Sequence, residues 1–222
     1  MGPNDTGVFT WTPAALPLEA AWERGLRRAS KRLLDLAVGS LLLAAAVPVL
    51  LVAAAAIRLT SRGPVFFVQP RIGHRCRRFS MYKLRTMVDG AEREEATLAR
   101  PGKVFFKLDD DPRITPVGRV LRRLSIDELP QVFNVLRGDM SLVGPRPLLV
   151  SDLERFPEAR QRVRFSMKPG LTGLWQVSGR SLLSDDDRVR LDEEYVERWS
   201  FGRDLAILVR TPAAVLSGRG AT

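Results

Sequence analysis

Cysteine and histidine are almost absent from this sequence, which contains one of each, Cys76 and His74, among its 222 residues. One cysteine excludes an intramolecular disulfide, and the two side chains together are too few for a zinc site. The glycine-rich phosphate-binding patterns G-x-G-x-x-G and G-K-[ST] are absent as well. Disulfide scaffolds, zinc modules and the common nucleotide-binding loops are therefore excluded.

Acidic residues are in the minority. The chain has 25 Asp and Glu against 35 Lys and Arg, a formal net charge of +10, and 45% hydrophobic residues. The hydrophobic content excludes wholesale disorder, and the length suits one domain or one domain plus an anchor. The basic excess predicts an anionic partner, and composition leaves three kinds open: a nucleic acid, a lipid surface or a phosphate-rich substrate.

Charged residues are missing altogether from residues 36–57. As a helix this run would be about 33 Å long, which is enough to cross a bilayer. A soluble core helix of this length would carry a polar stripe, so a membrane segment is the better interpretation. We assign residues 1–30 to an N-terminal tail and residues 31–59 to the membrane segment.

Two features indicate that this segment enters and leaves the membrane on the same side. Pro48, just past its middle, removes a helical hydrogen bond and bends the axis. Both flanks are basic, with Arg24, Arg27, Arg28, Lys31 and Arg32 before the segment and Arg58, Arg62, Arg71, Arg75, Arg77 and Arg78 after it. Because basic flanks stay in the cytoplasm, we expect a re-entrant helix broken at Pro48. A simple bitopic span is the alternative.

Residues 60–222 read as one small cytoplasmic domain. Strand-like residues 65–69 and 78–87 on either side of Gly73 predict a β-hairpin, with Lys83 and Arg85 on one face of its second strand. Helical patterns cover residues 89–99, 117–124, 127–136, 152–165, 187–199 and 205–216, and residues 169–179 form a glycine-rich loop. The predicted fold class is α+β and mostly helical: a re-entrant helix-break-helix anchor plus a small domain with a β-hairpin and surface amphipathic helices.

An acidic pair, Asp127 and Glu128, follows the basic residues Arg122 and Arg123. One interpretation is a capping box in which Ser125 caps the helix and Glu128 lies three residues on; Pro130 argues against that register, and a start nearer Asp127 suits it better. Either way both carboxylates sit at a helix N-terminus, which favours ionised acids and phosphate groups. An ionised Asp beside a phosphate can attack phosphorus, and a neighbouring Glu can hold Mg²⁺. Acids that merely begin a helix are the alternative.

Arg146 lies between two prolines, Pro145 and Pro147. The prolines restrict the backbone on either side, so the guanidinium is presented with little freedom. Such an arginine suits bidentate contact with a phosphate or a uracil ring. A rigid turn that carries a surface arginine is the alternative.

Several segments together resemble the bacterial sugar transferases, the monotopic phosphoglycosyl transferases. The matching stretches, in family order, are KRLLDLAVGSLLLAAAVPVLLVAAAAI, GPVFFVQPRIG, FSMYKLRTM, DDDPRITPVGRVLRRLSIDELPQVFNVLRGDMSLVGPRP and KPGLTGLWQVSGR. The resemblance runs from about Lys31 to the C-terminus. Two departures are Val47, where many members have Ser before the break proline, and Cys76, where Gly is frequent.

The resemblance implies an activity and a location. Members move a sugar-1-phosphate from a UDP-sugar to polyprenyl (undecaprenyl) phosphate and release UMP, through a phosphosugar-aspartyl intermediate and with Mg²⁺. This step begins the assembly of exopolysaccharide, O-antigen or capsule glycans. Members are held on the cytoplasmic face of the bacterial inner membrane by a re-entrant helix, so the partners implied are a UDP-sugar, the lipid phosphate and a phospholipid membrane. The resemblance also allows a homodimer.

The resemblance also implies roles for individual residues. Asp127 matches the nucleophile and Glu128 the metal ligand. The basic positions near the phosphates match Lys83, Arg85 and Arg122. The nucleotide-binding motif matches Pro145, Arg146 and Pro147. The entry to the membrane helix matches Lys31, Arg32 and Asp35, and its break matches Pro48.

Two further questions concern substrate and class. KPGLTGLWQVSGR resembles members that transfer a hexose, which favours UDP-glucose or UDP-galactose. The alternative from another class is a membrane-tethered basic scaffold or a nucleic-acid-binding protein without catalysis. Because acidic residues are interleaved with the basic ones and no recognition helix is visible, we expect no nucleic-acid partner.

Overall fold

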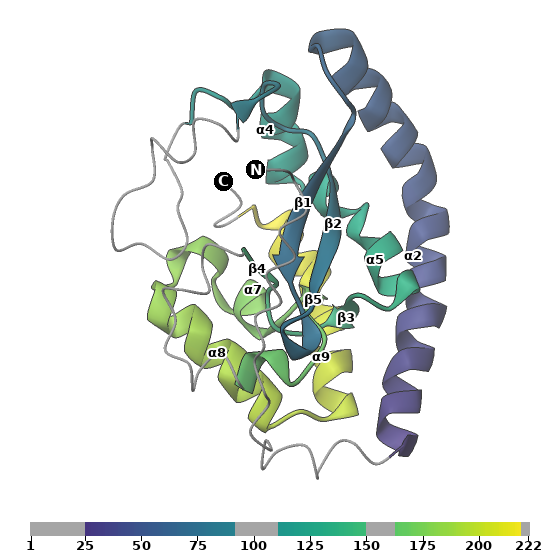
Figure 1. The fold of residues 1–222 in the computed structure, drawn as a ribbon, viewed down its shortest axis with the longest axis vertical. Helices are drawn as coiled ribbons and strands as arrows, with labels where there is room; N and C mark the ends of the chain where they lie inside the picture. Colours follow the sequence, from purple (N-terminus) through teal and green to yellow (C-terminus); the bar gives the residue numbers. More distant parts are fainter. Residues whose placement is uncertain (1–24, 92–110, 150–162, 219–222) are drawn as a thin grey trace, which may run out of the picture.

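The computed structural model describes residues 25–91, 111–149 and 163–218, and the side chains of all of these except residues 25–28 and 181. Residues 1–24 of the expected tail, and most of the helices expected over 89–99 and 152–165, lie outside the described residues. Figure 1 shows a long helix along one side of a smaller domain that is built from short strands and helices. The described part is thus mostly helical with small sheets, as the sequence predicted.

The long helix is α2, Gly25–Thr60, and it has 36 residues. It begins inside the stretch that we assigned to the tail, because residues 25–30 consist largely of good helix formers. Of the described residues, α2 forms the one helix long and apolar enough to cross a membrane, and 17% of its most apolar stretch is buried. So little burial is the opposite of what a core helix needs, which favours the membrane interpretation.

The break expected at Pro48 is a bend in a continuous helix. Pro48 lies inside α2, and Figure 1 shows the helix axis turning partway along its length. The helix-break-helix detail of the anchor is therefore not confirmed: one proline removes one hydrogen bond, and the flanking alanines and leucines continue the helix.

The predicted hairpin is confirmed. Strands β1, Phe66–Ile72, and β2, Arg78–Leu84, pair antiparallel from Phe66↔Leu84 to Ile72↔Arg78. Their connection contains a short 3₁₀ turn, His74–Cys76. Strand β4, Leu148–Leu149, adds to the free edge of β1.

A second, two-stranded sheet replaces part of the expected glycine-rich loop. Strand β5, Gly170–Thr172, pairs parallel with β3, Ser141–Val143, and helix α7, Leu174–Ser178, follows it. A Cβ on Gly170 would lie 2.1 Å from the amide nitrogen of Gly144, so glycine is required where these two chains meet. The loop prediction failed because glycines that serve close backbone approach look like loop residues in a sequence.

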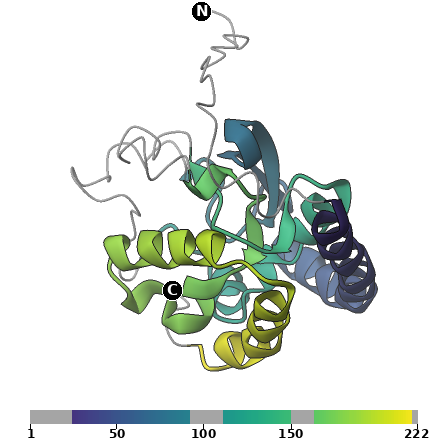
Figure 2. The same ribbon diagram turned by 90° about the horizontal axis from the view of Figure 1, so that it is seen from below.

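The remaining helices surround these strands. They are α4, Pro116–Arg123; η2, Ile126–Glu128; α5, Gln131–Arg137; η4, Arg180–Leu182; α8, Asp185–Glu197; and α9, Phe201–Leu216. Figure 2 shows α2, α8 and α9 placed around the strands. The main core contains Val135, Met140, Leu142, Met167 and Tyr195. Helices predicted over 117–124, 187–199 and 205–216 are thereby confirmed to within a few residues.

Candidate active site

The acidic pair lies in a 3₁₀ turn between α4 and α5. Glu128 donates its N–H to the carbonyl of Ser125, and Leu129 donates to Ile126. Ser125 has a left-handed backbone with φ of 54° and makes no side-chain cap, so the capping-box interpretation is wrong. Helix α5 begins only at Gln131, directly after Pro130, where the missing N–H of proline costs little.

Glu128 is held ionised by cations. Lys83 of β2 donates from Nζ to Oε1 of Glu128 at 3.1 Å, and the two side chains are 16% and 27% exposed. Burial is the largest single influence and favours the neutral acid, but Lys83, Arg146 and Arg180 together outweigh it, so the pKa of Glu128 falls well below its usual range. Glu128 is therefore a carboxylate at neutral pH.

Asp127 behaves in the opposite way. Its side chain is buried, with 8% of the residue exposed. Burial raises the pKa of Asp127 to about 6, against the charges of Lys83 and Arg122, while the neighbouring Glu128 adds to the rise. Two adjacent acids with pKa values pushed apart are typical of a site where each acid has its own role.

Arg122 is carried to Asp127 by a close helix contact. In α4, a Cβ on Gly118 would lie 2.0 Å from the carbonyl oxygen of Thr86, so glycine lets the helix pack directly on the chain after β2. The Nε of Arg122 then donates to Oγ1 of Thr86 at 2.8 Å, and its charge acts on Asp127.

Arg146 is fixed from several sides. Its N–H donates to Asp192 at 3.3 Å, and its carbonyl accepts from Arg164 at 3.0 Å. Arg164 and Asp192 form an ion pair of 2.8 Å with both side chains 2% exposed. The guanidinium of Arg146 stacks over Trp175, 5.4 Å from the ring centroid. The two prolines are thus one of several constraints on this arginine.

A small cavity joins these residues. Its lining includes Lys83, Glu128, Gln131, Arg146, Pro147 and Gln176. Asp127 does not itself line this cavity, although it is next to Glu128 in the chain. The structure therefore brings together six of the residues that the sequence selected: Lys83, Arg122, Asp127, Glu128, Arg146 and Pro147.

Arg85 is placed elsewhere. Its guanidinium donates to backbone carbonyls of the loop that follows α2: to Pro64 at 2.6 Å, to Ser61 at 3.2 Å and to Arg62. All three of its nitrogens are used in this way, so Arg85 ties the end of α2 to the hairpin and does not reach toward the acidic pair.

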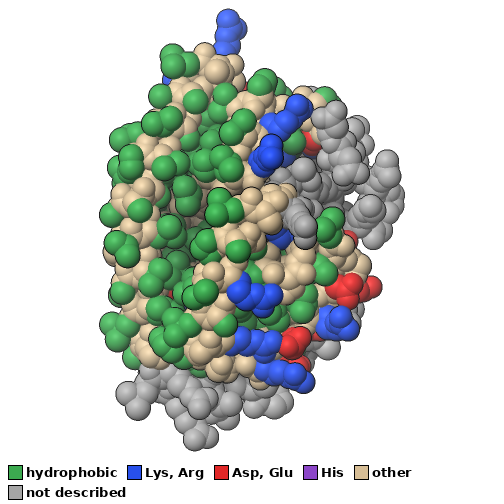
Figure 3. All heavy atoms as spheres, turned by 180° about the vertical axis from the view of Figure 1, so that it is seen from behind, with side chains coloured by type: hydrophobic (Ala, Val, Ile, Leu, Met, Phe, Trp, Pro, Cys, Tyr) green, Lys and Arg blue, Asp and Glu red, His purple; other side chains and the backbone are tan. Residues whose placement is uncertain are grey.

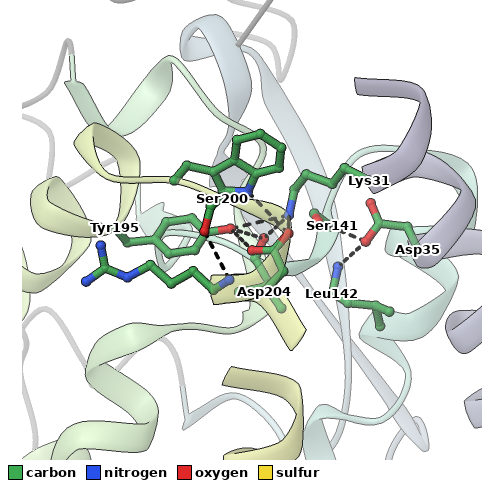
Figure 4. Close-up of polar contacts among 10 residues, drawn as sticks. Lys31, Asp35, Ser141, Leu142, Tyr195, Ser200 and Asp204 are labelled. Atoms are coloured by element: carbon green, nitrogen blue, oxygen red, sulfur yellow. Dashed lines mark hydrogen bonds and ion pairs between the residues drawn. The ribbon is translucent and has the colours of Figure 1, made fainter. Parts of the chain in front are cut away.

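The three residues at the entry of the membrane helix bind the domain. The Nζ of Lys31 donates to Asp204 at 2.6 Å and to the carbonyl of Val143 at 2.9 Å, and Figure 4 shows it within a buried polar cluster with Tyr195. Tyr195 in turn donates to Asp204 at 2.6 Å. The first turns of α2 are therefore attached directly to the domain.

Arg32 and Asp35 continue this attachment. Arg32 donates to the carbonyls of Val135 and Leu136 at 2.7 and 2.6 Å, at the last turn of α5. Asp35 accepts from the hydroxyl of Ser141 at 2.9 Å and from the N–H of Leu142 at 2.8 Å. Helix α5 directly follows the acidic pair, and β3 directly precedes the segment with Arg146. Through Arg32 and Asp35, α2 therefore contacts both of the elements that position these residues.

Sequence reasoning missed three residues near the site. Arg180 donates from Nη2 to the hydroxyl of Ser125 at 2.8 Å, and its charge acts on Glu128. Trp175 stacks with Arg146, and Asp192 accepts from its N–H. Arg180 and Trp175 lie in KPGLTGLWQVSGR, the motif that was recognised without a role for either. Asp192 gave no signal because it is one of seven acidic residues in α8.

The sequence was compared with known proteins. Residues 26–218 match the family described as bacterial sugar transferase. The chain is 41% identical over 212 residues, 92% of this chain and 93% of the relative, to exopolysaccharide production protein ExoY of Sinorhizobium fredii. It is 45% identical over 166 residues to undecaprenyl-phosphate galactose phosphotransferase of Salmonella typhimurium, and 43% identical over 212 residues to undecaprenyl-phosphate glucose phosphotransferase of Komagataeibacter xylinus. These two matches cover 72% and 86% of this chain but 35% and 36% of those longer relatives.

Proposed function

This chain belongs to the bacterial sugar transferase family and is a phosphoglycosyl transferase; from this premise we propose that it transfers a hexose-1-phosphate from a UDP-sugar to undecaprenyl phosphate and releases UMP. One observation carries the proposal: the adjacent acids Asp127 and Glu128 lie among four cations, and the pKa of Asp127 is raised while that of Glu128 is lowered. The four cations are Lys83, Arg122, Arg146 and Arg180. The relatives named for galactose and glucose favour one of these two sugars.

The proposed chemistry takes two displacements at phosphorus. An oxygen of ionised Asp127 attacks the phosphorus attached to the sugar; a P–O bond to the aspartyl oxygen forms, the bond to the UMP oxygen breaks, and UMP leaves as the anion. An oxygen of undecaprenyl phosphate then attacks the same phosphorus and displaces the Asp127 carboxylate. The cations offset the charge on the non-bridging oxygens, so positioning and electrostatics account for the catalysis.

Magnesium suits the donor set. Within the described residues, no group of three or more His, Cys, Asp and Glu side chains comes together. Glu128 offers an ionised carboxylate at the cavity that holds Lys83 and Arg146. Mg²⁺ is commonly bound by one or two carboxylates plus substrate phosphates, so we propose Glu128 as its protein ligand. When bound, the ion would offset the charge of the diphosphate.

We also propose that the domain lies on the cytoplasmic face of the inner membrane, with both ends of α2 on that side. Two contacts at opposite ends of the helix support this: Lys31 binds Asp204, and Ile57 packs with Leu84 and Leu121 in a buried cluster. A straight span would carry one of these contacts, and the polar domain attached to it, across the bilayer. Figure 3 shows hydrophobic side chains covering the α2 face, with Lys and Arg side chains gathered to one side of it.

The test is a screen for UMP release. Purified protein in detergent is given undecaprenyl phosphate, Mg²⁺ and one UDP-sugar at a time. We expect UMP and a sugar-diphosphate lipid in equal amounts with UDP-glucose or UDP-galactose, and little product with N-acetylated sugars.

Two control arms sharpen the screen. Replacing Mg²⁺ by a chelator should abolish UMP release, and Glu128→Gln should raise the Mg²⁺ concentration needed for half-maximal rate. Salt-sensitive binding to DNA with no UMP release from any donor would instead support a non-catalytic basic scaffold.

The pH dependence follows from Asp127. The nucleophile must be ionised, and burial raises the pKa of Asp127 to about 6. At pH 5, Asp127 is therefore protonated, and the enzyme inactive, in a larger fraction of molecules than if this aspartate had its ordinary pKa. We expect the UMP-release rate to fall about tenfold per pH unit below that pKa.

A variant identifies the group that titrates. Lys83 lowers the pKa of Asp127, so Lys83→Met should move the acid limb of the profile to higher pH. An acid limb near pH 4 in the parent enzyme, or one unmoved by Lys83→Met, would contradict this assignment.

A further inference from the structure

Arg180 has one nitrogen in use and one without a partner. Its Nη2 donates to the hydroxyl of Ser125 at 2.8 Å. Its Nη1 is out of contact with solvent and has no hydrogen-bond partner among the described residues. A buried charged donor left unsatisfied is costly, which indicates that a ligand atom completes this site.

The segment that carries Arg180 has two more such atoms. The Nε1 of Trp175, a residue 7% exposed, and the Oε1 of Gln176 are also buried without a hydrogen-bond partner in the part of the chain that the structure describes. Gln176 lines the cavity with Glu128 and Lys83. Three unsatisfied polar atoms within residues 175–180, one of them on a side chain that lines the cavity, favour this segment as part of a ligand site.

The charge of the site points to the kind of ligand. Four cations, Lys83, Arg122, Arg146 and Arg180, act on the two acids Asp127 and Glu128. Of these cations, Lys83 alone forms an ion pair with a carboxylate among the described residues. With both acids ionised, these six side chains together carry two positive charges in excess. This excess matches the two negative charges of a diphosphate or of a terminal phosphate.

Arg180 is also tied to the backbone of the acidic pair. Ser125, its hydrogen-bond partner, lies two residues before Asp127, and the carbonyl of Ser125 accepts a hydrogen bond from the N–H of Glu128. A ligand held by Nη1 is thereby connected, through one side chain, to the turn that presents both carboxylates. Guanidinium groups suit this double contact because their nitrogens form a rigid planar fork.

We infer that Arg180 is a phosphate-binding residue of the active site, with Nη1 on a phosphate oxygen of the substrate and Nη2 on Ser125. The inference rests on the proposed function, since the phosphate belongs either to the sugar nucleotide or to the lipid acceptor. Its chemistry is the same in both cases, and the measurement below separates the two.

The test compares Arg180→Met with Arg180→Lys, Ser125→Ala and a control, Arg190→Met. Arg190 is a 74% exposed arginine on α8 that pairs only with Asp187 among the contacts recorded for it. Initial rates are measured with UDP-glucose or UDP-galactose, whichever is turned over, while each substrate is varied in turn. Binding of UDP with Mg²⁺ is measured separately by calorimetry without the lipid.

For Arg180→Met we expect kcat/KM to fall about 10²-fold, and Arg180→Lys to recover part of this loss. Arg190→Met should be unchanged. Ser125→Ala leaves the phosphate contact in place and should lose much less than Arg180→Met. A loss confined to the UDP-sugar, together with weaker UDP binding, assigns the contact to the nucleotide; a loss confined to undecaprenyl phosphate assigns it to the lipid.

Two outcomes would overturn the inference while the proposed function stands. One is a parent enzyme that releases UMP and an Arg180→Met variant within threefold of it on both substrates. The other is a Ser125→Ala loss equal to that of Arg180→Met with UDP binding unchanged, which would make Arg180 a purely structural residue. If the parent releases no UMP from any donor, the proposed function fails, and equal UDP binding by parent and Arg180→Met would then overturn the inference as well.

Discussion

Asp127→Asn is expected to reduce UMP release by about 10³-fold or more, because the variant has lost the group proposed to form the covalent intermediate. The fold should be retained. Burial raises the pKa of Asp127. At a pH above that pKa, the ionised carboxylate is therefore less stable in the folded protein than it is in the unfolded chain, where water solvates it. A neutral amide of the same shape removes this penalty, and thermal unfolding at pH 7.5 should occur at the same or a higher temperature.

The measurement has two parts and one matched control. Initial rates of UMP release are compared with those of Asp89→Asn, the same substitution at an exposed aspartate, which should behave as the parent enzyme. Mass spectrometry of enzyme mixed with donor alone should show a hexose-phosphate adduct on the peptide that contains Asp127, absent in Asp127→Asn. Substantial turnover by Asp127→Asn, or no adduct with a donor that is turned over, would rule out covalent catalysis by this residue.

Lys31→Met is expected to cost about 3–5 kcal/mol of folding stability, the usual range when one partner of a buried ion pair is removed. The side chains of Lys31 and Asp204 are 11% and 0% exposed. Without the ammonium, the side-chain donors left to the carboxylate of Asp204 among the described residues are Tyr195 and Trp199. The same substitution also removes the bond to the carbonyl of Val143, just before the segment that carries Arg146.

A second substitution separates this explanation from a loss of membrane attachment. Adding Asp204→Asn removes the uncompensated charge, so the double variant should unfold close to the parent temperature in detergent. Arg58→Met, which removes an exposed cation of the same helix, should have little effect. If Lys31→Met unfolds like the parent in detergent yet detaches from membranes, Lys31 acts at the lipid surface and its contact with Asp204 contributes little.

The placement of Lys31, Arg32 and Asp35 changes how the anchor is understood. As a sequence they read as the charged entry to a membrane helix. In the structure they bind α5, β3 and α9, the elements next to the acidic pair and Arg146. The position of the acidic pair and Arg146 relative to α2 is therefore set by direct contacts between this helix and the domain.

Local features were predictable from the order of residues. The hairpin follows from strand-forming residues on either side of Gly73, and α4 from the helical pattern over residues 117–124. The charge-free run predicts a membrane helix because length and hydropathy are properties of one segment. Asp127, Glu128 and Arg146 could be selected because each belongs to a recognisable short motif.

Other features depended on contacts between segments far apart in the chain, and the sequence either did not predict these features or predicted them incorrectly. Lys83 and Arg85 are two residues apart, yet Lys83 binds Glu128 and Arg85 binds the loop after α2. Pro48 suggested a break, but continued hydrogen bonding on both sides makes it a bend within α2. Arg180, 52 residues beyond Glu128, comes to the site only because α7 and η4 fold back upon it.

The chain order alone was enough to predict the long apolar helix, the hairpin and the family, and to select the two acids as candidates, since those depend on periodicity and on motifs within short stretches. The tertiary structure alone decided which cations surround the acids, which acid keeps its proton to higher pH, and where α2 is attached. Charge interactions and burial depend on distances in space, and the residues concerned are up to 173 positions apart.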